Sequence, residues 1–190
     1  MNEYSKEMPA VRPVFDMELM LGLLQETRLG GQVMENLANA WERWLPCLRA
    51  MIIDTDGKRY LAIWLDESVE REVDDTWKQS ATEGFRLNAL AQTMIMGAVY
   101  QLLPEVEQAG CAPAPKPTPA LSAALEAEGI PYQEPDGPTL CRRFSVLTWM
   151  PFRGACDICH LRDHCPKAAA NAESFHSVEL PGNTRDQENR

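Results

Sequence analysis

The sequence predicts a mainly α protein with a small β-hairpin (α+β), followed by a C-terminal cysteine-rich metal-binding module. Three observations predict this class. Several segments carry apolar residues at helical spacing, one Asp-Gly pair separates two strand-like runs, and three of the six cysteines stand in one short run. A composition with 45% hydrophobic residues and five Trp among 190 residues supplies enough apolar side chains for a core.

Two helices are expected before the hairpin. Asp16 can cap the first, which should end near Gly30 and Gly31. Its apolar residues are Met17, Met20, Leu21 and Leu24. The second should stop at Pro46, because proline lacks the N–H that would continue a helix. Its apolar stripe consists of Val33, Leu37, Trp41 and Trp44. Cys47, next to this stripe, is expected to be a buried core thiol.

The hairpin prediction rests on Asp56-Gly57, a favoured two-residue turn because both residues tolerate positive φ. Strands are expected over residues 50–54 and 59–65.

The acidic segment 66–78 then predicts a helix with a solvated carboxylate face. Its apolar stripe consists of Val69, Val73 and Trp77, and its expected ion pairs are Glu67/Arg71 and Asp74/Lys78. Ser80 to Glu83 fits a capping box, after which a largely apolar helix is expected to run to Pro104.

The proline-rich segment 112–118 predicts a stiff spacer between two modules. We expect a helical domain with the hairpin over residues 1–111, a cysteine-rich metal or iron–sulfur module over 119–170, and a disordered tail over 171–190. Because such a spacer should make few tertiary contacts, proteases are expected to cut it first.

The cysteine-rich module should begin with a short helix. Thr118 can cap it with Pro119 at its first position, and Gly129 supplies a left-handed stop. A strand is then expected over residues 140–149, leading to the cysteine run.

Cys156, Cys159 and Cys165 follow the spacing Cys-x2-Cys-x5-Cys, and the run ends in Cys-Pro, as bacterial ferredoxin-type ligand runs often do. The spacing predicts an iron–sulfur cluster, most simply 4Fe-4S, with Cys141 as the fourth ligand and Cys111 in reserve.

A tetrahedral zinc site is the alternative. It would use the same three cysteines with either Cys141 or His164 as the fourth ligand.

This trio resembles the C-terminal iron–sulfur clip of CRISPR-adaptation and recombination nucleases of the PD-(D/E)XK type, in which a distant upstream cysteine completes a 4Fe-4S cluster. It is similar as well to the last three ligands of the endonuclease III class of DNA glycosylases and of the nitrogenase molybdenum-donor protein. The match covers about ten residues. The last two families place their first ligand where this chain has Trp149 or Pro151, and no Glu-x-Lys of the nuclease type follows a suitable strand.

The formal net charge of −10 opposes approach to a phosphate backbone or an anionic membrane. Residues 141–170 depart from this average, with five basic side chains against two acidic ones. We expect these cations to offset the charge of a thiolate-bound cluster; an acidic partner or a nucleic-acid strand is the alternative. The five are Arg142, Arg143, Arg153, Arg162 and Lys167.

The N-terminal residues 1–7 are polar and lack the basic and apolar regions of a secretion signal, so a cytoplasmic location is expected. No apolar stretch reaches the roughly 18 residues of a membrane span. In a reducing cytosol, six cysteines are explained better by metal ligation and burial than by disulfides.

The function expected from these observations is that of a cytoplasmic iron–sulfur protein, acting in electron transfer, as a cluster carrier, or as an accessory or maturation factor for a partner metalloenzyme or redox protein. Two alternatives stay open. One is a nucleic-acid-processing protein with a structural 4Fe-4S clip, and the other is a structural, zinc-stapled interaction domain.

Overall fold

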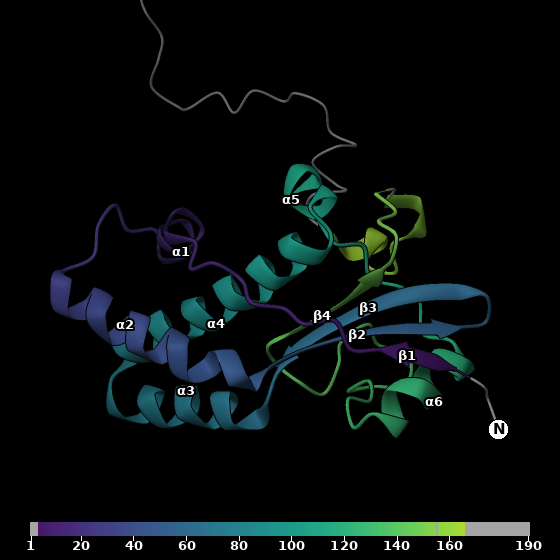
Figure 1. The fold of residues 1–190 in the computed structure, drawn as a ribbon, viewed down its shortest axis with the longest axis horizontal. Coiled ribbons are helices and arrows are strands. Elements are labelled where there is room, and N and C mark those ends of the chain that lie inside the picture. The colour runs from purple at the N-terminus through teal and green to yellow at the C-terminus, as the bar shows by residue number, and fades with distance from the viewer. Residues whose placement is uncertain (1–3, 155, 166–190) are drawn as a thin grey trace, which may run out of the picture.

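The computed structural model describes residues 4–154 and 156–165. In this part of the chain a four-stranded antiparallel sheet, ordered β1-β2-β3-β4, is combined with six α-helices (Figure 1). The predicted α+β class is confirmed. The cysteine-rich module stays a prediction, because part of its segment lies outside the described residues, as does the tail expected over 171–190.

Helices and strands are mixed along the chain. The strands are β1 Ser5–Glu7, β2 Leu48–Thr55, β3 Lys58–Leu65 and β4 Ser145–Trp149. The helices are α1 Met17–Leu24, α2 Gly31–Trp44, α3 Glu67–Gln79, α4 Ala81–Leu102, α5 Glu105–Ala109 and α6 Pro119–Ala127. Three short 3-10 helices are η1 Leu45–Cys47, η2 Cys156–Ile158 and η3 Arg162–His164.

The predicted hairpin is confirmed and is longer than expected. β2 and β3 pair antiparallel over eight residues each. Asp56 and Gly57 form the turn with φ values of 52° and 65°, the left-handed region for which an Asp-Gly pair is suited. The outer strands β1 and β4 pair with β2 and β3 respectively, and both come from segments distant in sequence.

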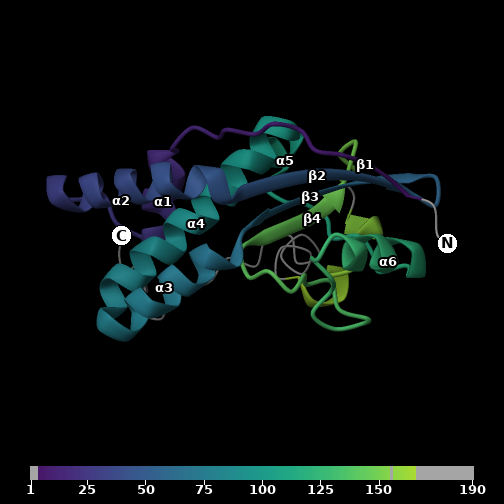
Figure 2. The ribbon, with the colours of Figure 1, turned by 60° about the horizontal axis from the view of Figure 1, so that its bottom comes forward.

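Both faces of the sheet are buried, because alternate side chains of β2 and β3 enter two different cores. One set packs against the larger helical layer and includes Ala50, Ile52, Leu61 and Ile63. The other set packs against α6 and includes Met51, Ile53, Tyr60 and Ala62. Figure 2 shows α6 beneath the strands, with α2, α3 and α4 gathered toward the opposite end of the molecule. Each fully buried large aliphatic side chain contributes about 1.5–3 kcal/mol relative to exposure.

The first helix has the predicted cap, but it is shorter than predicted. Asp16 accepts a hydrogen bond from the backbone of α1, as expected. The helix ends at Leu24, well before the glycine pair, because Gln25 adopts the left-handed conformation with φ of 55°. Gly30 instead precedes α2 as its cap residue. The buried residues of α2 are Leu37, Ala40, Trp41 and Trp44.

The acidic helix α3 forms as predicted, but its carboxylates have different partners. Glu67 lies 3.8 Å from Arg142, and Asp74 lies 2.7 Å from Arg143, in place of the basic residues four positions later on the same helix. The segment before β4 supplies these arginines, so contacts between distant segments replace the expected local pairs. Trp77, which was expected in the apolar stripe, is 41% exposed, whereas the other two stripe residues, Val69 and Val73, are buried.

The long apolar helix α4 also forms as predicted. The Ser80 hydroxyl accepts a hydrogen bond from the N–H of Glu83 at 3.3 Å, and the helix ends at Leu102, just before Pro104. The short helix α5 that follows was not predicted. Among the described residues no helix combines the length and the apolar character needed to cross a membrane.

The proline-rich segment is packed into the fold. Pro113, Ala114 and Pro115 are buried, and the Pro113 carbonyl accepts a hydrogen bond from the Thr148 hydroxyl of β4 at 2.9 Å. The expectation of few tertiary contacts is therefore wrong for this segment. The division of the chain into two domains stays a prediction.

The elements beyond the spacer follow the predicted signals in part. Thr118 caps α6 by accepting a hydrogen bond from the backbone, and Gly129 has φ of 74°, as a left-handed stop requires. β4 covers only the second half of the strand expected over 140–149. Its first half instead forms a single bridge between Leu140 and Tyr132.

Candidate functional site

The cysteine run folds as two short turns. Cys156 begins η2, and the backbone N–H of Cys159 donates to its carbonyl oxygen at 3.1 Å. The N–H of Arg162 donates to the carbonyl of Cys159 at 3.2 Å, and the N–H of Cys165 donates to the carbonyl of Arg162 at 3.3 Å. Each cysteine therefore stands beside a one-turn 3-10 unit, in which side-chain directions repeat about every three residues.

The thiols of the predicted ligand set lie at or near the surface. Cys141 and Cys156 are exposed, whereas Cys159, Cys165 and the reserve ligand Cys111 are half-buried. Within residues 4–154 and 156–165, no group of three or more His, Cys, Asp or Glu side chains has the arrangement of a metal site. The predicted ligand set stays a prediction.

His160 ties the cysteine run to two other segments. Its backbone N–H donates to the carbonyl of Ala114 in the spacer at 2.9 Å. Its Nε2 lies 3.0 Å from the carbonyl oxygen of Asp136, and because a carbonyl can only accept, Nε2 is the donor. Ile158 packs against the core beneath α6, so the run is also anchored by apolar contact. His164, the alternative fourth ligand of a zinc site, is exposed.

Cys141 closes the loop that meets His160. Its N–H donates to the carbonyl of Pro131 at 2.8 Å, next to the bridge between Tyr132 and Leu140. Asp136 lies within the loop that this bridge closes. The predicted fourth ligand and the cysteine run are therefore linked through one hydrogen bond, although their thiols form no ligand group.

Two of the five cations counted near the cysteines are held by α3. Nη1 of Arg143 lies 2.7 Å from Oδ1 of Asp74, and its backbone N–H donates to Oε1 of Glu70 at 3.0 Å. Nη1 of Arg142 lies 3.8 Å from Glu67 and 3.9 Å from Glu70. Their charge is largely neutralised by α3, so the positive charge beside the cysteine run is smaller than the sequence count indicates.

Glu128, which follows α6, fixes β1 to the body of the fold. Its carboxylate accepts hydrogen bonds from the Lys6 ammonium at 2.7 Å and from the Tyr4 hydroxyl. The bonds from Lys6 and Tyr4, in that order of effect, lower the pKa of the Glu128 carboxyl.

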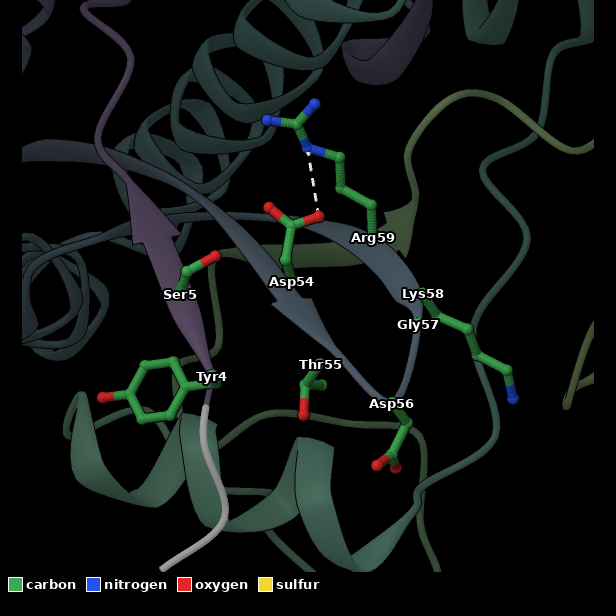
Figure 3. Close-up of a pocket in the computed structure, with 8 residues that line it drawn as sticks. All are labelled: Tyr4, Ser5, Asp54, Thr55, Asp56, Gly57, Lys58 and Arg59. Carbon is green, nitrogen blue, oxygen red and sulfur yellow. Dashed lines mark ion pairs between the residues drawn. The ribbon is translucent and has the colours of Figure 1, made fainter.

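A cavity of about 590 Å³ lies beside the hairpin turn and the start of β1. Figure 3 shows Asp54 and Arg59 on one side of the hairpin, where they form an ion pair at 3.5 Å. Thr55 and Asp56 extend to the other side, where α6 lies. Thr55 is only 4% exposed, and its hydroxyl has no hydrogen-bond partner within the described part of the chain.

Further polar groups without partners lie on the same face of the sheet. The hydroxyls of Tyr60 and Tyr132 and the indole N–H of Trp149 are buried and form no hydrogen bond to any described residue. All three residues pack in the core beneath α6. Sequence reasoning missed this group, because strand alternation can place Tyr60 and Trp149 inward but cannot show what their polar atoms meet.

No protein-family model matches this chain, and neither a curated protein nor a solved structure matches it.

Proposed function

We propose that this chain is a cytoplasmic iron–sulfur protein that binds a cluster, of the 4Fe-4S type, through Cys156, Cys159 and Cys165, with Cys141 as the fourth thiolate. Its proposed role is electron transfer, cluster carriage, or maturation of a partner metalloenzyme. The chemistry of the donor set supports this proposal, because thiolates are the ligands that hold iron–sulfur clusters.

The fold of the cysteine run is the observation that carries the proposal. Cys156 and Cys159 flank one hydrogen-bonded turn, and Cys165 follows the next. Turns of this kind let cysteines separated by two residues face one site. Because thiols lose their protons on binding and metal binding is coupled to local folding, the ligands need not converge before the metal is bound.

The position of the cysteine run favours exchange of electrons or of a cluster with a partner protein over chemistry on a buried substrate. Cys141 and Cys156 are exposed, so a cluster held by these residues would lie close to the surface. The anchoring of His160 to Ala114 and of Ile158 to the core would hold that surface against the rest of the fold.

The proposal is tested by purifying the full chain anaerobically and measuring iron, acid-labile sulfide and zinc. We expect iron and sulfide in similar amounts with a broad absorbance near roughly 400 nm, which arises from thiolate-ligated clusters. Stoichiometric zinc without sulfide would overturn the redox proposal and support the zinc-stapled interaction domain.

Single cysteine variants then test the ligand set. Alanine at Cys156, Cys159, Cys165 or Cys141 should abolish the absorbance and most of the bound iron. Cys47→Ala is the matched control, because Cys47 is not in the proposed ligand set. The expectation that Cys47 is a buried core thiol is wrong: it is half-buried against the helical layer, and the hydroxyl of Ser68 lies 3.8 Å from its sulfur. If Cys141→Ala keeps its iron while Cys111→Ala or His164→Ala loses it, the assigned fourth ligand is wrong.

A further inference from the structure

The face of the sheet toward α6 holds a surplus of hydrogen-bond donors. Of the five buried side-chain polar atoms without a partner in the described residues, four lie here. They are Thr55 Oγ1, Tyr60 OH, Tyr132 OH and Trp149 Nε1. Each can donate a hydrogen bond, and the indole can only donate. Buried donors left unpaired are rare in folded proteins, so their concentration on one face calls for an acceptor.

These donors belong to one region. Tyr60 and Trp149 stand opposite each other on β3 and β4, with ring centroids 4.9 Å apart. Tyr132 packs against the same core. Thr55, at the end of β2, lines the cavity beside the hairpin turn, and Figure 3 shows its hydroxyl directed toward α6, between Tyr4 and Asp56.

Two cations lie over the same tryptophan. The Lys58 ammonium is 5.8 Å and the Arg153 guanidinium carbon 5.0 Å from the ring centroid of Trp149. Neither side chain forms an ion pair with a carboxylate in residues 4–154 and 156–165. Lys58 also lines the cavity, so positive charge and unpaired donors occur at the same end of the hairpin.

Two carboxylates, those of Asp54 and Asp56, line the cavity. Asp56 lines the cavity and opposes an anion, whereas Asp54 is engaged by Arg59 on the other side of the hairpin. Burial is the main cause that raises the pKa of the Tyr60 hydroxyl, and it raises that of Tyr132 as well. Both groups therefore remain neutral O–H donors at neutral pH.

We propose that this end of the hairpin binds a small oxyanion, the phosphate or carboxylate group of a small molecule. Its oxygens accept a hydrogen bond from the hydroxyl of Thr55, which is the one of these four residues that lines the cavity, and Lys58 and Arg153 offset its charge. Two uncommitted cations against the single carboxylate of Asp56 favour an anion over a cation. The proposal does not rest on a cluster at the cysteine run, although Ile158 of that run packs against the same core as Trp149.

The test follows the indole N–H signals of the full-length ¹⁵N-labelled protein by NMR. Trp149 is assigned as the signal missing from Trp149→Phe. Inorganic phosphate and acetate are added separately to about 50 mM at constant ionic strength, a range that detects millimolar affinity. We expect a saturable shift of the Trp149 signal with at least one probe, and the stronger probe identifies the preferred oxyanion.

Charge-matched variants then test which residues bind the anion. Combining Lys58→Gln with Arg153→Gln should weaken the affinity about tenfold or more, since charge-assisted contacts are lost. Arg49→Gln is the control, because that cation lies at the other end of β2, does not line the cavity and is paired with Asp66. Its effect should be less than about twofold.

Thr55→Val removes the donor that lines the cavity and retains the branched side chain, so it should weaken binding while the other indole signals keep their positions. Two results would overturn the proposal. One is the absence of a saturable shift with either probe, which would leave ordered water as the partner of these donors. The other is an equal loss of affinity in Arg49→Gln, which would show a general charge effect.

Discussion

The carboxylate of Glu70 in α3 binds the segment that leads into the edge strand β4. It accepts the backbone N–H of Arg143 at 3.0 Å and lies 3.9 Å from Arg142, and its side chain is 16% exposed. Glu67, one turn earlier, is 56% exposed and lies 3.8 Å from Arg142 without a bond to the main chain. The two carboxylates thus differ in burial and in their hydrogen bonding on a single helix.

We predict that Glu70→Ala lowers the free energy of unfolding by about 2 kcal/mol. A hydrogen bond to a charged group contributes about 1.5–3 kcal/mol, and the exposure of Arg143 favours the lower end of that range. The partly buried ion pair with Arg142 adds about 0.5 kcal/mol. Glu67→Ala removes an exposed pair alone and should lower the stability by less than about 0.5 kcal/mol.

Urea unfolding followed by circular dichroism measures both effects against the wild type. The denaturant dependence should stay unchanged, so that the midpoint reports stability. In about 1 M salt the small effect of Glu67→Ala should vanish, whereas most of the effect of Glu70→Ala should persist, because its main-chain bond is short and screened little. Equal losses from the two variants, or less than about 0.5 kcal/mol for Glu70→Ala, would refute this reasoning.

Three further predictions concern Glu128, the segment 113–115 and the two arginines before β4. Because its folded pKa is lowered, the Glu128 carboxylate stabilises the protein above its unfolded pKa of about 4.3, and this contribution is lost as pH falls through the lower folded value. Glu128→Gln, which weakens the contact with Lys6, should reduce the difference between urea midpoints at about pH 7 and pH 3.5. Limited proteolysis with proteinase K should leave the buried segment 113–115 intact at times when other sites are cut; first cleavage there would show that its contacts with β4 open easily. Arg142→Glu combined with Arg143→Glu should lower the urea midpoint, and neither it nor the wild type should show salt-sensitive binding of duplex DNA in a fluorescence anisotropy titration.

Local signals predicted the elements whose geometry is set within a few residues. The Asp56-Gly57 turn, the Ser80 cap and the Gly129 stop each depend on conformational preferences of the residues themselves, and each appears as predicted. The premature end of α1 at Gln25 had no such signal, because a glutamine rarely takes the left-handed conformation.

Pairing between distant segments could not be predicted in this way. β1 has three exposed polar residues and gains its strand conformation by pairing with β2. The arginines before β4 likewise meet α3 across about seventy positions of sequence. A short stretch of sequence does not show which distant residues will contact it. The ion pairs predicted inside α3 were therefore those between near neighbours, and they are wrong.

The candidate site also depends on contacts between distant segments, first in the placement of its thiols. Spacing singled out Cys156, Cys159 and Cys165, but the bond from His160 to Asp136 that links this run to the loop before Cys141 is a product of the fold. The backbone bond from His160 to Ala114 links the run in the same way to the segment that follows Cys111. Both upstream segments thus meet the run through the fold, which the spacing alone could not show.

The position of unpaired positive charge in the fold differs from the position that the sequence predicts. The excess of cations in residues 141–170 favoured either compensation of a cluster or contact with nucleic acid. In the fold, α3 neutralises Arg142 and Arg143, whereas Lys58, from an acidic part of the sequence, joins Arg153 over Trp149. Lys58 and Arg153, which have no carboxylate partner among the described residues, thus form a pair of cations at the end of the hairpin where Thr55 lines the cavity. A pair is too few for a phosphate backbone, which is bound through many cations, but it is enough for one small anion.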